Sequence, residues 1–346
     1  MIRIAISGAG AIAERAHLPA LASVPGAQIV AIQSRTLEKA RRVAQSLWPE
    51  ESSRPKVYSD FAEMLARERP DAAGIFTPNY LHCEYTLKAL AAGAHVLVEK
   101  PIAPRASDAR RMVEAAADAK RVLMVSMQRR YGGFESELKR ALEEGAIGTP
   151  HFIRARLSHG GPESWAPGQK WFTSAAEAGG GAMLDLGIHV ADLAIWYLGE
   201  VDSVVGRVAT LGKQIEVDDT GAMIMNFRSG ALGVIEASWS SRPGLSAIEV
   251  YGSEGRAMMG YPRVGIAIQR ADGSAAPGFS REEILARFDS RDLLAPFRAL
   301  AQNFLDAIEG RAAPMPDGAD GLRAIEAVEA CYRSARSGAA VRLPLQ

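Results

Sequence analysis

A short glycine pattern near the N-terminus narrows the folds open to this chain more than any other stretch. Residues Gly8-Ala9-Gly10-Ala11-Ile12-Ala13 form a GxGxxA pattern directly after the apolar run Ile2–Ser7. After a strand, the first glycine permits a tight turn, the second lets the backbone approach a pyrophosphate, and the last small residue lets the helix pack on the strand. The N–H groups at the helix start would face the phosphates. The alternative is a turn without a ligand. The pattern predicts dinucleotide binding by Gly8, Gly10, Ala11, Ile12 and Ala13.

The residues up to about 126 alternate short apolar runs with amphipathic stretches. The runs carry apolar residues on both faces, which is typical of a parallel sheet covered by helices. We therefore expect an α/β domain with a doubly wound parallel sheet and right-handed crossovers. Thr36, Asp60 and Ser107 are the expected helix N-caps. The expected strands are Ile2–Ser7, Gln28–Gln33, Asp71–Thr77, His95–Val98 and Val122–Ser126, and the expected helices are Thr36–Leu47, Asp60–Glu68, Tyr80–Ala92 and Ser107–Ala119.

From about residue 127 onward, segments that alternate every second residue are separated by turn signals such as Ser229-Gly230. This pattern predicts a mostly antiparallel sheet with a few helices. We therefore expect a dinucleotide-binding Rossmann domain at 1–126 and an α+β domain for substrate binding and oligomerisation at 127–346. The expected helices there are Phe134–Glu144, Leu184–Leu198, Leu293–Glu309 and Gly318–Ala335, and the expected strands are His151–Ser158, Val201–Thr210, Gly221–Phe227, Ala231–Ser240, Ser246–Tyr251 and Gly265–Gln269.

Length and charge exclude several kinds of protein. The chain has 346 residues, enough for two domains, and its 40 basic and 40 acidic side chains leave no surplus for coating nucleic acid. Cys83 and Cys331 lie far apart and suggest neither a disulfide scaffold nor a CxxC metal pair. We see no signal peptide, and prolines break the longest uncharged run, Ala16 to Ser34. We therefore expect a cytoplasmic protein with no nucleic-acid or membrane partner.

The end of the second expected strand bears on the choice between NAD and NADP. An acidic residue often stands here to bind the ribose 2′-hydroxyl, whereas this chain has Ser34 followed by Arg35. A hydroxyl and a guanidinium would bind the 2′-phosphate that a carboxylate would repel, so the pair favours NADP. The alternative is that Ser34 or Thr36 caps the next helix while Arg35 lies in solvent or stacks on adenine.

The tripeptide Glu99-Lys100-Pro101 follows the strand His95–Val98. Ligands of open α/β sheets bind beyond the carboxyl ends of the strands, so Lys100 would emerge at the site. Pro101 disfavours a helical conformation at Lys100 and stiffens its approach. The alternative is an exposed Glu–Lys pair on the surface.

A glycine run precedes a helix with two stripes in the stretch Gly179–Asp192. Apolar residues form one stripe, and Asp185, His189 and Asp192 form a polar one at i, i+4 and i+7. A histidine held against carboxylates can transfer protons, because a carboxylate supports the imidazolium and orients the ring. The helix has only one histidine, so we expect no metal site. The alternative is a core histidine beside an aspartate of the first turn.

In this order, the motifs resemble the glucose–fructose oxidoreductase/inositol dehydrogenase family, often called Gfo/Idh/MocA. The combination of Glu-Lys-Pro with GGGxxxDxxxHxxD is specific. The resemblance implies a Rossmann domain, a second domain with a large open sheet, and NAD(P)-dependent reversible hydride transfer at a hydroxyl or carbonyl carbon of a sugar, inositol or related polyol. The stretches that carry it, between Ile2 and about Tyr251, are Gly8–Ala13, Thr77–His82, Gly93–Pro101, Arg130 to Gly148, and Gly179–Asp192.

The resemblance also implies roles for single residues. Lys100 matches the family's catalytic lysine, which contacts both cofactor and substrate, and Asp185 and His189 match its Asp/His pair. Arg130 and Trp171 fall where the family lines the substrate site. The cofactor loop matches at Thr77, Pro78, Asn79 and His82, and Glu99 sits beside the nicotinamide in similar enzymes.

Two alternatives share this fold, a non-catalytic dinucleotide-binding regulator and a glycosidase that uses NAD transiently. A regulator would not need Lys100 together with Asp185 and His189, which favours an enzyme. Trp165 and Trp171 either pack on the C–H face of a sugar or lie at a domain interface. Apolar residues on both faces of the later strands predict a homodimer or homotetramer, because an uncovered face would expose an apolar patch.

Overall fold

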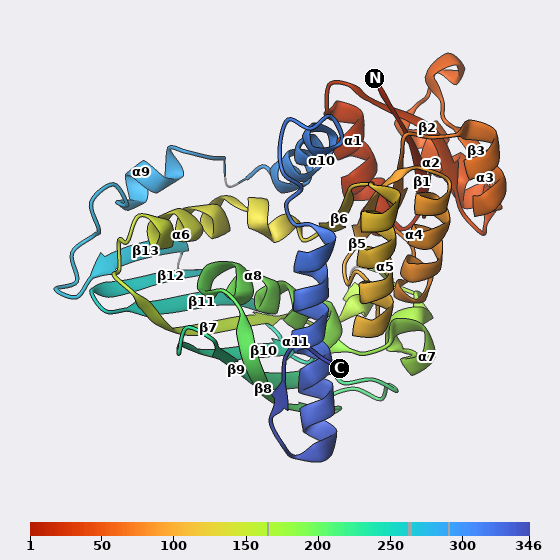
Figure 1. The fold of residues 1–346 in the computed structure, drawn as a ribbon. Helices are drawn as coiled ribbons and strands as arrows, with labels where there is room; N and C mark the ends of the chain where they lie inside the picture. Colours follow the sequence, from red (N-terminus) through yellow and green to blue (C-terminus); the bar gives the residue numbers. More distant parts are fainter. Residues whose placement is uncertain (165, 262–264, 290) are drawn as a thin grey trace. The chain divides into compact units, whose positions relative to one another are not determined.

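The computed structural model describes the chain apart from residues 165, 262–264 and 290 (Figure 1). The described residues form two compact units, each built from two chain segments. The first unit contains Met1–Gln128 and Leu294–Leu322, and the second contains Arg129–Leu293 and Arg323–Gln346. This differs from the expected division into 1–126 and 127–346, because residues 294–322 belong with the first unit.

Contacts at strand β6 (Leu123–Ser126) explain why the chain returns to the first unit. The backbone N–H of Val125 donates to the carbonyl oxygen of Pro316 at 3.1 Å, and Met124 forms an isolated bridge with Asp317. A Cβ on Gly321 would lie 2.6 Å from the Val125 side chain, so helix α11 (Gly318–Ser337) starts close against the strand. Helix α10 (Ala295–Ile308) packs against α1 (Leu18–Ser23). Residues 294–322 therefore complete the first unit.

The first unit contains a six-stranded parallel sheet in the order β3-β2-β1-β4-β5-β6. This order defines the doubly wound Rossmann arrangement. Ile4, Ala5 and Ile6 are all 0% exposed, so the central strand is buried on both faces. The other strands are β1 (Ile2–Ser7), β2 (Ala27–Gln33), β3 (Lys56–Tyr58), β4 (Ala72–Ile75) and β5 (His95–Glu99), and the other helices are η1 (Ala13–His17), α2 (Leu37–Leu47), η2 (Glu51–Ser53), α3 (Phe61–Glu68), η3 (Asn79–Leu81), α4 (His82–Ala91) and α5 (Ala106–Ala119).

The second unit contains an eight-stranded sheet in the order β13-β12-β11-β7-β10-β9-β8-β14. Neighbouring strands are antiparallel except β7 and β10, which are parallel. The expected fold class, a Rossmann domain plus an α+β domain with a mostly antiparallel open sheet, is confirmed. The strands are β7 (Pro150–Ser158), β8 (Val201–Ala209), β9 (Thr220–Phe227), β10 (Leu232–Ser238), β11 (Leu245–Gly252), β12 (Gly255–Tyr261), β13 (Gly265–Arg270) and β14 (Val341–Arg342), and the helices before α11 are η4 (Gln128–Tyr131), α6 (Gly133–Glu143), η5 (Pro162–Ser164), η6 (Lys170–Thr173), α7 (Ala175–Ala178), η7 (Met183–Gly187), α8 (Ile188–Leu198) and α9 (Arg281–Leu285).

The two faces of this second sheet differ in burial. Met223 and Met225 of β9 are buried, whereas Ile224 between them is 42% exposed. Val205 of β8 lies opposite Ile224 and is 41% exposed, and Leu232 of β10 is 37% exposed. Helices α6 and α8 pack against the sheet (Figure 1). One face therefore belongs to the core, and we call the other, with Val205, Ile224 and Leu232, the open face.

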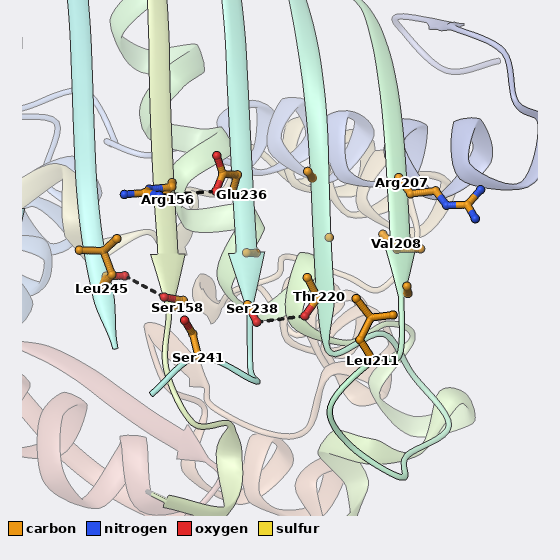
Figure 2. Close-up of a pocket in the computed structure, with 14 residues that line it drawn as sticks. Arg156, Ser158, Arg207, Val208, Leu211, Thr220, Glu236, Ser238, Ser241 and Leu245 are labelled. Atoms are coloured by element: carbon orange, nitrogen blue, oxygen red, sulfur yellow. Dashed lines mark hydrogen bonds and ion pairs between the residues drawn. The ribbon is translucent and has the colours of Figure 1, made fainter. Parts of the chain in front are cut away.

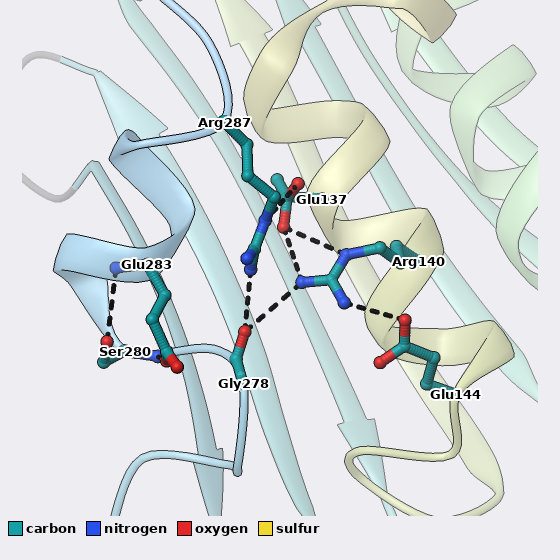
Figure 3. Close-up of polar contacts among 7 residues, drawn as sticks. All are labelled: Glu137, Arg140, Glu144, Gly278, Ser280, Glu283 and Arg287. Carbon is teal, nitrogen blue, oxygen red and sulfur yellow. Dashed lines mark hydrogen bonds and ion pairs between the residues drawn. The ribbon is translucent and has the colours of Figure 1, made fainter.

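An arginine network fastens the α9 segment to α6 (Figure 3). Glu137 of α6 accepts from Arg287 at 2.9 Å through one carboxylate oxygen and from Arg140 at 2.9 Å through the other. Both arginines also donate to the carbonyl oxygen of Gly278, at 2.7 and 3.3 Å. The segment after β13 is thus held to a helix of the same unit.

The helical stretch Ala175–Leu198 is long and apolar enough to cross a membrane by length and composition alone. Within its most apolar window, however, 89% is buried inside the protein. Such burial is typical of a core helix, and no other helix in the described part of the chain has that length and composition.

Candidate functional site

The glycine turn between β1 and η1 is tight on one side and open on the other. Gly8 has a φ of +111°, and a Cβ there would lie 2.2 Å from the carbonyl oxygen of Phe76. No atom lies within 4 Å of where a Cβ on Gly10 would stand. Ala13, at the start of η1, is fully buried. A tight turn, an accessible backbone and a helix start fit the pyrophosphate of a dinucleotide.

A buried histidine–glutamate pair, which the sequence did not predict, connects η1 to β5. His17, the last residue of η1, is 2% exposed, and its Nε2 lies 2.6 Å from Oε1 of Glu99. The histidine ring stacks on Phe76 with centroids 3.8 Å apart. η1 is a π-helix, a local widening often found at functional sites. The only signal in the sequence was a histidine soon after the glycine pattern, and its partner stands 82 residues away.

Glu99 links this histidine to Lys100. Burial opposes ionisation of Glu99, but the hydrogen bond with His17 and the positive charges of His17 and Lys100 outweigh it, so the pKa of Glu99 lies below its ordinary value. Its Oε2 accepts a hydrogen bond from the backbone N–H of Lys100 at 2.9 Å. The carboxylate therefore fixes the backbone that carries the Lys100 side chain at the carboxyl end of β5.

His82 ties together the loops that follow β4 and β5. Its side chain is fully buried, with Nδ1 2.8 Å from the carbonyl oxygen of Pro101 and Nε2 2.8 Å from that of Thr77. Burial lowers the pKa of His82, and the two carbonyl oxygens beside its ring nitrogens oppose that shift without cancelling it. The hydroxyl of Thr77 is buried without a hydrogen-bond partner among the described residues, which fits a loop that gains a bond when a ligand binds. Pro78 and Asn79 continue this loop into η3.

The residues expected at the adenosine end lie after β2. The hydroxyl of Ser34 accepts a hydrogen bond from the backbone N–H of Thr36 at 3.3 Å. Thr36 makes no side-chain cap to α2, and Arg35 is exposed. Ser34 thus makes a local turn bond, and the Arg35 guanidinium stands in solvent where a phosphate can reach it.

In the second unit, Asp185 lies on η7 and His189 on α8. The Nε1–H of Trp239 donates to Oδ2 of Asp185 at 3.2 Å, and Trp239 itself is 1% exposed. His189 is 8% exposed. Trp239 was absent from the residues that the sequence suggested, because the indole lies 54 residues further along the chain.

The third residue of the expected polar stripe, Asp192, pairs with an arginine. Asp192 accepts two hydrogen bonds from Arg130, at 3.0 and 2.7 Å, and the two side chains are 1% and 3% exposed. Asp192 therefore forms a buried ion pair with Arg130 of η4. Arg130, which the resemblance put beside the substrate, has its guanidinium in this pair.

The loop before η7 is described in part. Trp171 is half-buried and stacks on Phe172 with centroids 3.7 Å apart. Trp165, the other aromatic residue expected near a sugar, lies outside the described residues. Among the residues that the structure describes, no group of three or more His, Cys, Asp and Glu side chains could hold a metal ion.

A cavity of about 360 Å³ lies on the open face of the second sheet (Figure 2). Its lining includes Arg156 and Glu236, whose side chains face each other across β7 and β10, and Thr220, which is hydrogen-bonded to Ser238 at 3.0 Å. None of the residues expected to carry the chemistry lines it.

Comparison with known proteins covers both units. Residues 2–127 match "Oxidoreductase family, NAD-binding Rossmann fold", and residues 136–258 match "GFO/IDH/MocA C-terminal domain". The chain is 30% identical to 1,5-anhydro-D-fructose reductase of Ensifer adhaerens over 99% of each protein. It is 31% identical to myo-inositol 2-dehydrogenase of Thermotoga maritima over 74% of each.

Solved structures agree. The WlbA dehydrogenase from Bordetella pertussis, in complex with NADH and UDP-GlcNAcA, has a TM-score of 0.87 and 28% identity, over 100% of this chain and 98% of that one. Together with a relative at 30% identity along almost the entire chain, these matches assign the protein. It belongs to the Gfo/Idh/MocA family and is an NAD(P)-dependent oxidoreductase.

Proposed function

We propose that this enzyme catalyses reversible hydride transfer between NADP or NAD and the hydroxyl or carbonyl carbon of a sugar, inositol or related polyol. One observation carries the proposal: the turn at Gly8, the loop at Thr77 and Lys100 follow β1, β4 and β5 of one parallel sheet. Ligands of doubly wound sheets bind at that carboxyl edge. The relatives named above act, by their names, on 1,5-anhydro-D-fructose and myo-inositol, which supports a polyhydroxylated substrate.

The proposal assigns cofactor binding to the first unit. The turn Gly8 to Ala13 would hold the pyrophosphate, and Ser34 and Arg35 would hold the adenosine ribose with the 2′-phosphate of NADP, the preferred cofactor. The nicotinamide end would lie along Thr77, Pro78, Asn79, Glu99 and Lys100, with His82 holding the two loops beneath it. When bound, the nicotinamide supplies the hydride acceptor, or the donor in the reverse direction.

Lys100, Asp185 and His189 would handle the substrate hydroxyl. Its oxygen becomes negative as the proton leaves, so the site must take the proton and stabilise the charge. In this proposal His189 accepts the proton, and the Asp185 carboxylate one turn earlier would orient and support the ring. The Lys100 ammonium donates to the same oxygen. Trp171 would form an apolar wall against the sugar, and Arg130 would act through Asp192 on the helix.

A cofactor-coupled screen tests the proposal. The purified enzyme is incubated with NADP or NAD and polyols such as myo-inositol, and with reduced cofactor and keto-sugars such as 1,5-anhydro-D-fructose. We expect a change in absorbance of the reduced nicotinamide with at least one compound, and none with Lys100→Met. Cleavage of a glycoside without net reduction would instead identify a glycosidase. Cofactor binding without any conversion would contradict the enzymatic proposal and favour a regulator.

A further inference from the structure

A carboxylate from another part of the chain holds the start of the helix that carries Asp185 and His189. Ala182, the residue before η7, makes no side-chain cap. Instead, Asp218, which precedes β9, accepts from the backbone N–H of Gly181 through Oδ1 and from that of Met183 through Oδ2, each at 2.8 Å. N–H groups at a helix start have no partner within the helix, so this remote carboxylate does the work of an N-cap.

Tyr332 of α11 is the second side chain that holds this helix start. We call the hydrogen bonds of Asp218 and Tyr332 to the backbone of residues 181–183 the attachment. Its hydroxyl donates to Oδ1 of Asp218 at 2.7 Å and accepts from the N–H of Gly181 at 3.2 Å. Removal from water and the adjacent Asp218 carboxylate raise the pKa of Tyr332 well above its ordinary value, so the hydroxyl keeps the proton that it donates. Asp218 is 8% exposed, so the three hydrogen bonds that its carboxylate accepts are largely shielded from water.

The same attachment explains the glycine run before the helix. A Cβ on Gly181 would lie 1.8 Å from the carbonyl oxygen of Asp218, and one on Gly180 would lie 2.5 Å from the hydroxyl of Tyr332. Backbone and side chain of the attachment therefore occupy the space beside both glycines. Packing inside the second unit therefore requires glycine at positions 180 and 181.

The neighbouring Asp219 extends the attachment to the Asp185 side chain. The carbonyl oxygen of Asp219 accepts from the backbone N–H of Trp239 at 2.7 Å. The indole of Trp239 in turn donates to Asp185. Residues 218 and 219 thus fix both the backbone of η7 and the indole that orients the Asp185 carboxylate.

We propose that Asp218 and Tyr332 are positioning residues for this enzyme, which hold Asp185 and His189 in place without touching substrate or cofactor. The proposal rests on the function proposed above, in which these two side chains handle the proton. A displacement of about 1 Å at a reacting group can cost ~10²-fold in rate. Loosening the attachment should therefore lower kcat, while cofactor affinity, which the proposal assigns to the first unit, stays unchanged.

Two tyrosine variants separate positioning from general stability. Tyr332→Phe removes the bond to Asp218, whereas Tyr197→Phe removes a bond of 3.0 Å from the other end of the same helix to the carbonyl oxygen of Glu135. We expect kcat to fall about tenfold in Tyr332→Phe, the scale of one lost hydrogen bond, with an unchanged Kd for the reduced cofactor. Asp218→Asn should fall further, and Tyr197→Phe should stay near the wild type.

Amide hydrogen exchange gives a readout that needs no substrate. Exchange at Gly181 and Met183 should be faster in Tyr332→Phe and unchanged in Tyr197→Phe. If both kcat and exchange of Tyr332→Phe equal those of Tyr197→Phe, the positioning role is wrong. If the wild type converts no substrate, the proposed function fails, and unchanged exchange in Tyr332→Phe would then also overturn the attachment.

Discussion

Oxidation of a hydroxyl needs an acceptor for the proton, and the proposal gives that task to His189 while Lys100 stabilises the oxygen. His189→Ala and Lys100→Met should each lower kcat by at least ~10²-fold, the usual effect of losing an acid–base or oxyanion-stabilising group. Steady-state kinetics on an accepted substrate measures this, and fluorescence of the reduced cofactor should show little change in its binding to His189→Ala. Near-normal kcat in His189→Ala would make Lys100 the base.

Arg35 decides the expected preference for NADP, because only NADP carries a 2′-phosphate on the adenosine ribose for its exposed guanidinium. Arg35→Ala should weaken NADPH binding by about 1.5–3 kcal/mol, the scale of a hydrogen bond to a charged group, and NADH binding far less. Titration of both cofactors by fluorescence measures the two losses. Equal losses would show that Arg35 stacks on adenine.

The His17–Glu99 pair predicts a stability change with a defined sign. Because folding lowers the pKa of Glu99, its ionisation adds stability that is present above the unfolded pKa of about 4.3 and is lost as the pH falls through the folded pKa. Glu99→Gln should lower the free energy of unfolding at neutral pH by roughly 3 kcal/mol, the scale for breaking a buried pair.

Denaturant unfolding at several pH values measures this loss, which should shrink on acidification. Glu84→Gln, which removes an exposed pair with Lys88, is the matched control and should cost less than about 0.5 kcal/mol. A Glu99→Gln variant as stable as Glu84→Gln would mean that the buried pair contributes nothing.

Between elements, the Arg130–Asp192 pair joins η4 to α8. Arg130→Met should cost about 3–5 kcal/mol of unfolding free energy, because it leaves the Asp192 carboxylate buried without its guanidinium. Arg130→Met combined with Asp192→Leu should recover much of that loss. Chemical denaturation of the two variants measures both effects. Full stability with only a raised substrate KM would return Arg130 to the substrate site.

Local patterns predicted most elements, and they failed where the pattern was short or ambiguous. The Asp60 cap is confirmed, since its carboxylate accepts from the N–H of Glu63 at 2.6 Å. The Ser107 cap is wrong, because α5 begins at Ala106 after Arg105. The unexpected strands are β3 and β14, which have three and two residues, and β12, whose sequence GRAMMGY lacks β-branched residues.

Side-chain partners were harder to predict than elements, because they join distant parts of the chain. The motifs identified Glu99, Asp185 and Asp192 as single residues, but nothing in their spacing indicated His17, Trp239 or Arg130 as partners. The π-helical geometry of η1 and η7 was equally hidden, since apolar spacing does not distinguish an occasional π-turn from an α-helix.

At the scale of the whole molecule, we predict a homodimer or homotetramer whose copies meet on the open face. Val205, Ile224 and Leu232 expose apolar side chains there, and soluble proteins usually cover such patches. Ile224→Lys should therefore shift the assembly towards monomer in light scattering at micromolar concentration. Leu293→Lys, which alters an exposed leucine elsewhere, should not. A monomeric wild type would remove the prediction.

During synthesis, the first unit cannot be finished when its first 128 residues leave the ribosome. At that moment β6 lacks Pro316 and Asp317, and α1 lacks α10. All of Arg129–Leu293 is made before these partners emerge, although N-terminal domains generally fold first. The nucleotide-binding half is therefore started first but completed only after Arg129–Leu293 has been made, and a nascent chain paused in between exposes the edge of an unfinished sheet.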